Sequence, residues 1–508
     1  MTRPGTAHSR SWRGRAALAV ALRSRSLPLV PVAVALILGL TGCAVGPDYQ
    51  APSLALTANH ANARHARPIR PGELTDWWKR FGDPTLNQLI EEAVAANLDV
   101  AAATARIRAA RATRVQAAAA FFPQVNGGAS SSHARSSASA SGVNFTSNLY
   151  QAGFDASWEL DLFGETRRSL EAADRGVEAA EESLRTTLLT LVGDVAQNYV
   201  EAKGFLARAG FAQRTVAIQR QTAALTRARF DAGAASAVDV ARATALASST
   251  SANIPTLETA FSASAHRIGV LIGREPAAVV ARLRRGTGIP APRHNLPPGV
   301  PADVLLQRPD VRLAERLLAQ STARIGQAEA ALYPSISLTG SLRTSGIRIG
   351  DLGNGSSLAW SYGPSVTIPV FNAGRLRAAV EVAEAQRDQS YAGFHQAVLF
   401  ALEDVENALV GLAQQRIRYQ SLATAVRNFR EAGRLARIVY GQGASSFLEV
   451  LDAERSLYDS EDSLLQSQVL IATRFIALGK ALGGGPGGVI DVSRPLVVDG
   501  DRGPRLAR

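Results

Sequence analysis

The stretch Tyr440-Gly-Gln-Gly-Ala-Ser-Ser-Phe-Leu-Glu-Val-Leu-Asp-Ala-Glu-Arg455 interrupts a very long helical pattern and predicts a tight turn between two helices. Gly443 can adopt the left-handed conformation that ends a helix. Ser446 can cap the following helix, with Glu449 three residues later as its capping-box partner. The same frame recurs in Phe230-Asp-Ala-Gly-Ala-Ala-Ser-Ala-Val-Asp-Val240. The chain is therefore predicted to contain two copies of one helical hairpin tip.

A long helical segment precedes each tip. Residues 164–232 and 375–439 contain no proline, and apolar residues recur in them at spacings of three and four. A helix of about 65 residues would span about 100 Å at 1.5 Å per residue, a length that no ordinary globular core needs. A shorter return helix follows each tip and is predicted to end near Gly273 and Leu482.

Two-residue alternation predicts strands before each long helix. Between Leu149 and Phe163 apolar residues occupy every second position and mostly polar residues lie between them. This pattern is typical of a strand with one apolar and one polar face. The Ser-, Ala- and Gly-rich segment 124–141 is a weaker strand candidate, and segments 335–343 and 358–370 alternate in the second half. The chain therefore supplies four amphipathic strands.

The second half of the chain repeats the first. One interval separates Asp99-Val100 from Asp310-Val311 and also Phe121-Phe-Pro123 from Leu332-Tyr-Pro334. Each half is predicted to run helix–strand–strand–long helix–tip–long helix. The predicted divisions are a first repeat at 76–285 (strands about 124–163, hairpin about 164–273), a Pro/Gly-rich crossover at 286–301, a second repeat at 302–482 (strands about 335–371, hairpin about 374–482) and a tail at 483–508.

The N-terminus has the pattern of a secretory signal. Arg23 and Arg25 precede an apolar run over residues 27–40, which leads into Leu40-Thr-Gly-Cys43. The run is too short and ends too abruptly for a membrane-spanning helix. We therefore predict that residues 1–42 are a signal peptide that is removed.

Leu-x-Gly-Cys at this place resembles the bacterial lipobox, in which the cysteine is lipidated and becomes the first residue. Cys43 is the only cysteine in the chain and is a candidate lipid anchor. The alternative is a buried free cysteine with a structural role. Ala44 follows it, and the resemblance then implies sorting to the outer membrane, with residues 43–75 as a lipid-anchored tether.

Charge and motifs exclude several classes of function. The formal net charge is +12, but six arginines lie before Cys43, so the remaining chain is only mildly basic. Such a charge does not argue for a nucleic-acid partner. The sequence has no zinc-type Cys/His cluster, phosphate-binding loop or nucleophile elbow. We therefore expect no enzyme activity, no metal and no cofactor apart from the covalent lipid on Cys43.

The four strands suggest a membrane protein that assembles from several chains. A four-stranded sheet has open edges, which is not viable inside a membrane. Lipid-facing apolar residues with aromatic girdles and a polar lumen are typical of membrane barrels, and three copies would supply twelve strands. The alternative is a soluble four-stranded sheet on a helical bundle. The aromatic residues of the apolar face favour the barrel, and they are Tyr150, Phe154, Trp158, Trp360 and Tyr362.

Several motifs, in order along nearly the whole mature chain, resemble the outer membrane factor family. These are the TolC/OprM-type channel-tunnels of tripartite efflux pumps, in their lipoprotein, NodT-like branch. The matching motifs are the lipobox, Trp77-Trp78 with Phe81-Gly-Asp-Pro84, Leu296-Pro-Pro-Gly-Val-Pro301 leading to Arg308-Pro-Asp310, Phe371-Asn-Ala-Gly-Arg375, and the two tips.

The resemblance implies a mostly α-helical homotrimer with a small β part. Its twelve-stranded outer-membrane β-barrel would continue into a long periplasmic α-helical barrel. It also implies a passive, gated conduit that exports small molecules, such as drugs and toxic compounds, from an inner-membrane pump through a periplasmic adaptor. The implied surroundings are outer-membrane lipid and the periplasm. The competing hypothesis is a structural lipoprotein that bridges the envelope without transport.

The resemblance also assigns roles at the tips. By position, the family's periplasmic gate falls on Asp239, Tyr440, Leu448, Glu449, Asp452 and Arg455. Glu449 and Asp452 share one helix face, and three chains would form a ring of carboxylates that attracts cations. Other interpretations remain open: Glu449 and Asp239 as capping acids, Asp452 with Arg455 as a surface pair, and Tyr440 as a packing residue. Ser445 departs from family members that place an arginine there.

The same resemblance predicts adaptor contacts at the hairpin tips. Small residues there would let another helical hairpin approach closely. The predicted contact residues are Gly233, Ala234 and Ser236 in the first tip and Gly443, Ala444 and Ser446 in the second.

Overall fold

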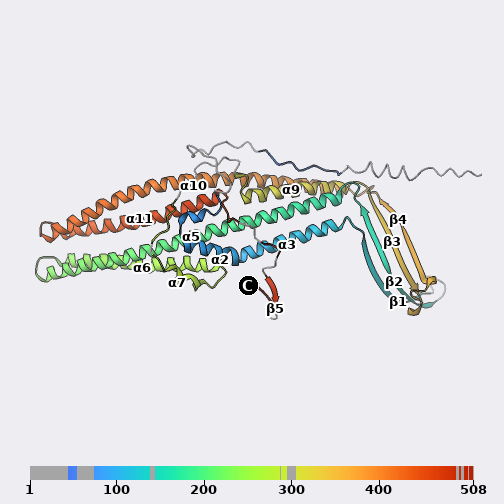
Figure 1. The fold of residues 1–508 in the computed structure, drawn as a ribbon, viewed down its shortest axis with the longest axis horizontal. Helices are drawn as coiled ribbons and strands as arrows, with labels where there is room; N and C mark the ends of the chain where they lie inside the picture. The colour runs from blue at the N-terminus through green and yellow to red at the C-terminus, as the bar shows by residue number, and fades with distance from the viewer. Residues whose placement is uncertain are drawn as a thin grey trace, which may run out of the picture. The chain divides into compact units, whose positions relative to one another are not determined.

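A computed structural model describes residues 44–53, 74–137, 144–286, 288–293, 305–487, 491–493, 497–500 and 503–506. All of them belong to one unit, Ala44–Arg508. The predicted signal peptide, Cys43, most of the tether and nearly all of the crossover, including Leu296–Pro301, lie outside the described residues. Most of the described chain is helical (Figure 1). Within it, no helix is both long and apolar enough to cross a membrane.

Four long strands form one antiparallel sheet in the order β1-β2-β3-β4. All four predicted strands are therefore present, including the Ser- and Gly-rich first one, which was the weaker candidate. The bounds are Gln124–Ser136 for β1, Phe145–Leu160 for β2, Ser335–Gly346 for β3 and Leu358–Thr367 for β4.

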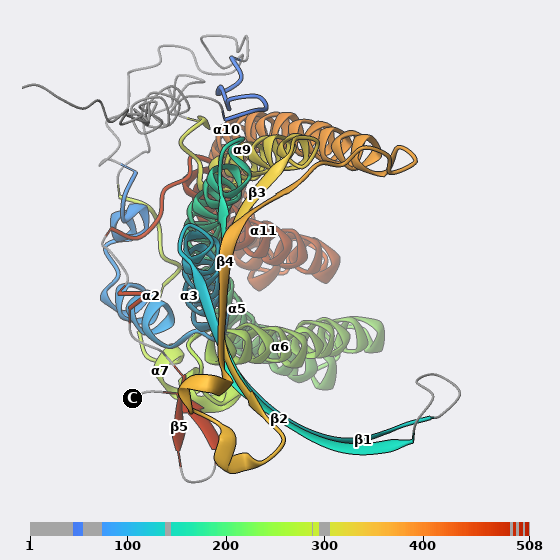
Figure 2. The same cartoon turned by 90° about the vertical axis from the view of Figure 1, so that its right-hand side faces the viewer.

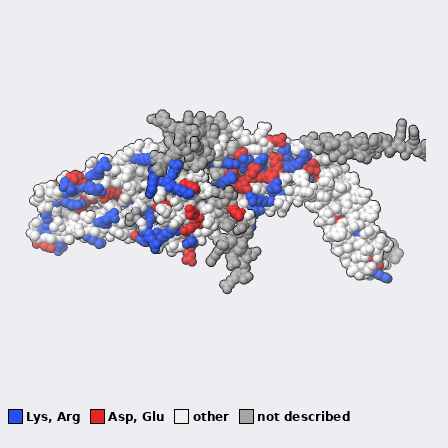
Figure 3. All heavy atoms as spheres, in the orientation of Figure 1, with Lys and Arg blue, Asp and Glu red and all other residues white. Residues whose placement is uncertain are grey.

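The two faces of this sheet differ sharply in chemistry. On one face the register places Phe154 opposite Leu342, and Leu342 opposite Trp360. These side chains are exposed, Trp360 to 68%. The other face is polar, with an ion pair of 2.7 Å between Asp155 and Arg343. Charged residues gather over the helices and are sparse over the strands in the view of Figure 3.

Each pair of strands leads into a long helical hairpin. The helices α5 (Glu165–Asp231) and α10 (Arg375–Gly441) each have 67 residues. The return helices α6 (Ala237–Leu271) and α11 (Phe447–Ala481) each have 35, and α6 continues through Pro255. At 1.5 Å per residue, α5 and α10 each span about 100 Å. The tips therefore lie at the opposite end of the helices from the sheet (Figure 1).

The two hairpins lie side by side, as the view turned by 90° shows (Figure 2). Two shorter helices, α3 and α9, pack against the strand-proximal halves of the long helices.

Side-chain caps determine where the short helices α2 and α3 begin. The Asp83 carboxylate accepts from the backbone N–H of Thr85 and Leu86, and Asn97 caps α3 in the same way. The bounds of these helices are Pro84–Ala96 for α2, Leu98–Ala119 for α3 and Pro309–Ala330 for α9.

The main core surrounds the middle of the hairpins. Trp77, in the short 3-10 helix Trp77–Phe81, is fully buried and packs edge-on against Phe475 of α11. Its indole Nε1 donates to the carbonyl of Gly484 at 2.9 Å. A side chain at Gly479 would collide with the same indole. The Tyr199 hydroxyl of α5 donates to Asp83 at 2.7 Å. The motif residues Trp77 and Asp83 thus join the N-terminal segment to both hairpins.

Beyond the hairpins, the chain forms small additional elements. A 3-10 turn (Pro276–Val279) leads into the short helix α7 (Val280–Leu283) after α6. Buried Lys203 of α5 donates to the carbonyls of Leu283 and Arg285, which fixes this segment against the long helix. In the C-terminal segment, β5 (Val497–Gly500) and β6 (Gly503–Leu506) pair as an antiparallel hairpin that the sequence did not predict.

The segment 44–53 is attached to the start of α5. The Val45 N–H donates to the carbonyl of Phe163 at 3.1 Å. Arg168 is buried and donates to the carbonyls of Val45 and Gly46 and to the Asp48 carboxylate. Ala44 thereby lies against Gly164, at the junction of β2 and α5.

Candidate functional site at the hairpin tips

The first tip folds as its sequence predicts. Gly233 has a φ of 74°, and the Ala234 N–H donates to the carbonyl of Arg229 at 2.7 Å. The Asp239 N–H donates to the Ser236 hydroxyl at 3.1 Å, and the Ser236 N–H donates to the Asp239 carboxylate at 3.2 Å. The capping box is complete, so Asp239 holds the start of α6.

The second tip has the same turn but a different cap. Gly443 has a φ of 77°, and the Ala444 N–H donates to the carbonyl of Val439 at 3.1 Å. Ser446 has the backbone conformation of an N-cap, but its side chain makes no capping hydrogen bond. The predicted Ser446–Glu449 capping box is therefore wrong. At the first tip the short Asp239 side chain also accepts from the Ser236 hydroxyl at 2.7 Å and positions it. The longer Glu449 makes no such contact.

Two acidic residues of the second tip, Glu449 and Asp452, have no ion-pair partner among the described residues. Leu448, Glu449, Asp452 and Arg455 are exposed on α11. Among the described residues, Glu449 has no hydrogen-bond or ion-pair partner, and no ion pair joins Asp452 to Arg455. The contacts that would make Glu449 a capping acid, or Asp452 and Arg455 a surface ion pair, are therefore absent from the described residues. Both carboxylates are free to meet solvent, ions or another chain.

Tyr440 connects the two tips instead of standing free. Its ring packs against Phe447 with 5.5 Å between ring centroids, beside buried Ala243 of α6 and Val450 of α11. Its hydroxyl is buried and has no hydrogen-bond partner in the described chain. These contacts agree with the packing interpretation of Tyr440.

Arg229 completes this contact, and sequence reasoning missed it. Its Nη1 donates to the Tyr440 carbonyl at 2.9 Å and its Nη2 to the Gly441 carbonyl at 3.0 Å. Its guanidinium also lies over the Tyr440 ring. Arg229 is a basic residue in the last turn of α5, which is a recognisable signal. A basic residue at this position predicts hydrogen bonds to the last carbonyls of its own helix, whereas Arg229 donates to carbonyls of α10.

Further contacts join α5 to α11 between the tips and the core. Arg208 makes a two-pronged ion pair with Asp462, at 2.7 and 2.9 Å. Phe211 stacks on Tyr458 with 5.4 Å between ring centroids. Buried Glu454 accepts from Thr222 of α5 at 3.3 Å and from Arg437 of α10 at 3.2 Å, and burial raises the pKa of its carboxyl. These contacts hold the two hairpins together above the tips.

Comparison with known proteins identifies the family of this chain. A sequence model of the family described as "Outer membrane efflux protein" matches residues 89–274 and 300–484. The chain belongs to this family. It resembles "Nodulation protein T" of Rhizobium leguminosarum bv. trifolii, with 37% identity over 88% of this chain and 95% of that protein. It is 31% identical to the "Cation efflux system protein CusC" of Escherichia coli K12, over 90% of this chain and 99% of that protein.

Solved structures agree with the sequence matches. The outer-membrane channel OprN has a TM-score of 0.81 and 36% identity, over 87% of this chain and 99% of that chain. A CusC structure has a TM-score of 0.76 and 30% identity, over 87% of this chain and 100% of that chain. The protein is thus an outer-membrane efflux protein of the NodT-like branch, located in the outer membrane and extending into the periplasm. Its family consists of efflux channels, not enzymes.

Proposed function

We propose that this chain forms the passive, gated conduit of a tripartite efflux system and carries small molecules, such as drugs and other toxic compounds, to the cell exterior. Three copies would close a twelve-stranded β-barrel, continued by a periplasmic barrel of their helical hairpins. A periplasmic adaptor would join this conduit to an inner-membrane pump.

The observation that carries this proposal is the four-stranded sheet. Phe154, Leu342 and Trp360 line up across β2, β3 and β4 on a face that is exposed in the single chain. In the described residues, β1 and β4 each pair with one neighbour and leave two open edges. An exposed apolar face and open edges are liabilities for an isolated sheet. Closure with further copies in lipid would remove both.

Lipidation of Cys43 is part of the same proposal. Ala44, the residue after it, lies at the β2–α5 junction, where the sheet gives way to the helices. A lipid on the residue bonded to Ala44 would be attached near the helix-proximal end of the sheet, close to the periplasmic surface of the membrane. Replacing Cys43 with Ser should abolish incorporation of radiolabelled palmitate. Continued labelling of the Ser variant would contradict the assignment.

The gate is proposed at the second tip. Glu449 and Asp452 are exposed near the end of the hairpin and have no partner in the described part of the chain, and three chains would bring six such carboxylates around one axis. A ring of this kind attracts cations and repels anions. Leu448 and Arg455 are exposed on the same helix and would line the same opening. Asp239 and Tyr440 would support it through the cap and the packing described above.

Conductance in planar bilayers tests the gate. Asp452→Ala should weaken cation selectivity and raise the opening frequency, because it removes half of the proposed ring. Asp459→Ala, also exposed on α11 but two turns away, is the matched control. Channels of the Asp452 variant that keep wild-type selectivity and opening frequency would refute the gate assignment.

The tips are also the proposed adaptor contacts. Ala234, Ser236, Ala444 and Ser446 are exposed around Gly233 and Gly443. Both glycines have positive φ, so a bulky residue there would strain the turn as well as block a partner. Ala444 lies outside that region, which makes Ala444→Trp the cleaner test. We expect it to abolish drug resistance while the protein still assembles, with Ala444→Ser as the control. Full resistance with the Trp variant would rule out a close contact at this tip.

The competing function is a structural lipoprotein that bridges the envelope. A conduit requires closure of the strands across chains, whereas a bridge does not. Outer-membrane fractions should contain trimers that survive SDS at room temperature and dissociate on boiling. A monomer under mild conditions, in cells that keep normal drug resistance when the gene is deleted, would favour the bridging function.

A further inference from the structure

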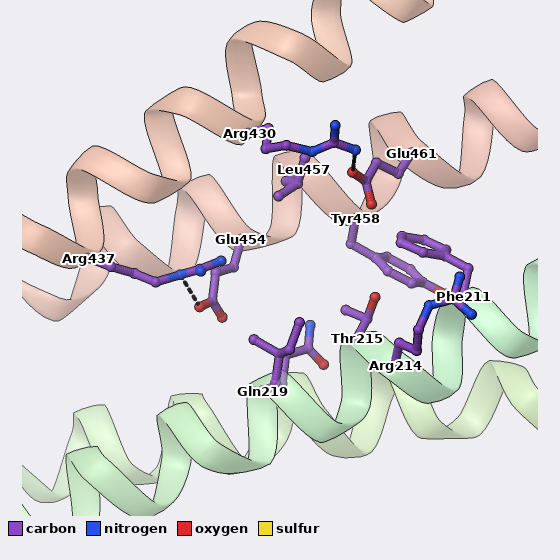
Figure 4. Close-up of a pocket in the computed structure, with 11 residues that line it drawn as sticks. Phe211, Arg214, Thr215, Gln219, Arg430, Arg437, Glu454, Leu457, Tyr458 and Glu461 are labelled. Carbon is purple, nitrogen blue, oxygen red and sulfur yellow. Dashed lines mark hydrogen bonds and ion pairs between the residues drawn. The ribbon is translucent and has the colours of Figure 1, made fainter.

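A pocket of about 340 Å³ lies in the seam between the two hairpins, between the tips and the core. Figure 4 shows α5 side chains on one side of it, including Phe211, Arg214 and Gln219, and side chains of α10 and α11 on the other. The volume is at the lower end of the range of small-molecule sites. Neither the gate nor the adaptor contact accounts for this pocket.

The floor of the pocket carries an unsatisfied amide. Gln219 is 2% exposed, and neither its Oε1 nor its Nε2 has a hydrogen-bond partner among the described residues. Buried polar atoms without partners are rare in folded proteins, because nothing compensates their loss of water. The amide lines the pocket and faces the opposite hairpin. One N–H₂ donor and one carbonyl acceptor are therefore available there, and the terminal torsion of a Gln side chain turns easily.

The charges of the pocket favour an anion. Two of its three arginines are already paired, Arg430 with Glu461 and Arg437 with Glu454. Arg214 lines the same pocket and has no ion-pair or hydrogen-bond partner in the described chain. The lining thus has one guanidinium in excess. A guanidinium and an amide N–H₂ together suit a carboxylate or sulfonate.

The remaining wall is apolar. The stacked rings of Phe211 and Tyr458 lie across the seam, and Leu457 and Ile218 add aliphatic surface. Aromatic faces of this kind accept a flat ring by offset stacking. The wall therefore selects for a molecule with an apolar body in addition to its charged head.

We propose that this pocket binds a small amphipathic organic acid, with its anionic head at Arg214 and Gln219 and its apolar body against Phe211 and Tyr458. Such a ligand contacts both hairpins at once. Because it binds only when the hairpins are adjacent, it stabilises that arrangement by mass action. None of the residues that line the site is one of the proposed gate or adaptor residues.

The test uses the full chain purified in a non-ionic detergent and the fluorescent anion 1-anilinonaphthalene-8-sulfonate as the probe. The wild type should show one saturable site per chain. Arg214→Gln and Gln219→Leu should each weaken the affinity at least tenfold. Arg434→Gln is the matched control, since Arg434 is an exposed α10 arginine that pairs with Glu431 outside the pocket. Wild-type affinity in both pocket variants would overturn the proposal.

Two further readouts separate a ligand site from a structural role. Gln219→Leu removes the unsatisfied atoms at nearly constant volume, so the melting temperature should stay level or rise while binding is lost. A fall in melting temperature with unchanged binding would mean that Gln219 serves the fold alone. Ethidium, a cationic aromatic dye, should not displace the probe. If ethidium displaces the probe as well as an aromatic carboxylate does, the site has no preference for an anion.

Discussion

The guanidinium of Arg229, at the end of the first long helix, lies over the ring of Tyr440, with 4.5 Å between Arg229 Cζ and the ring centroid. The same group donates to the carbonyls of Tyr440 and Gly441 at the C-terminus of α10. Cations are favourable both near a helix C-terminus and over an aromatic face. The two hairpins of one chain are thus attached to each other at their tips by a side chain of the first and the backbone of the second.

Removing this attachment should loosen the tips. Arg229→Ala should destabilise the contact between the two tips by about 1–2 kcal/mol. This free energy corresponds to a roughly five- to thirtyfold shift of the equilibrium towards separated tips. In cells the channel should leak, and sensitivity to vancomycin, which the intact outer membrane excludes, should increase. Arg227→Ala is the control, because the contacts of Arg227 within the described chain are with Asp231 and Phe230 of its own helix. Equal vancomycin sensitivity in the two variants would show that Arg229 does not fasten the tips.

The two caps should respond differently to loss of their serines. Ser236→Ala removes a complete capping box and should destabilise the start of α6 by about 1 kcal/mol. Ser446→Ala removes no capping hydrogen bond and should have little effect. Hydrogen exchange of the first turns of α6 and α11 measures both. The prediction fails if both variants speed exchange to the same extent.

Glu454 should make stability depend on pH. Burial raises the pKa of its carboxyl in the folded chain above its ordinary value near 4.5, so the folded state holds the proton more tightly than the unfolded state. Its contribution to stability is then fully present below pH 4.5 and is lost as the pH rises through the raised pKa. Glu454→Gln should remove this dependence, because the neutral amide resembles the protonated acid.

The relevant measurement is the difference in melting temperature between wild type and Glu454→Gln from pH 4 to pH 7. That difference should grow in favour of the variant as the pH rises. Glu431→Gln is the control, since Glu431 pairs with Arg434 at the exposed surface. A difference that stays constant with pH would show that Glu454 titrates as an ordinary surface acid.

The N-terminal segment should depend on Arg168. This buried side chain donates to the carbonyls of Val45 and Gly46 and pairs with Asp48 at 2.8 Å. Arg168→Ala leaves these groups without their partner, so hydrogen exchange over residues 44–53 should speed up about tenfold. Arg185→Ala, on the same helix with Glu182 as its hydrogen-bonded partner, should leave that exchange unchanged. Slow exchange in the Arg168 variant would mean that other contacts hold the segment.

Local chemistry made much of the fold predictable. The absence of proline over residues 164–232 and 375–439 leaves helices free to continue, and a glycine in the left-handed region ends each of them. Strict alternation gave β2, β3 and β4, since successive strand residues face opposite sides. The Ser- and Gly-rich segment of β1 predicted a strand less clearly. The predicted Ser446–Glu449 capping box was wrong, because a sequence motif does not determine the direction in which a serine hydroxyl points.

The sequence by itself determined the long hairpins, the tip turns and the two-faced strands, because each depends on residues within a few positions of one another. Only the tertiary structure decided the contact of Arg229 with Tyr440, the ion pair of Arg208 with Asp462 and the pocket around Gln219. These groups lie on different hairpins, more than 200 residues apart in two of the cases. Which helix faces meet depends on the rotation and offset of whole helices, and a periodic apolar stripe leaves both undetermined.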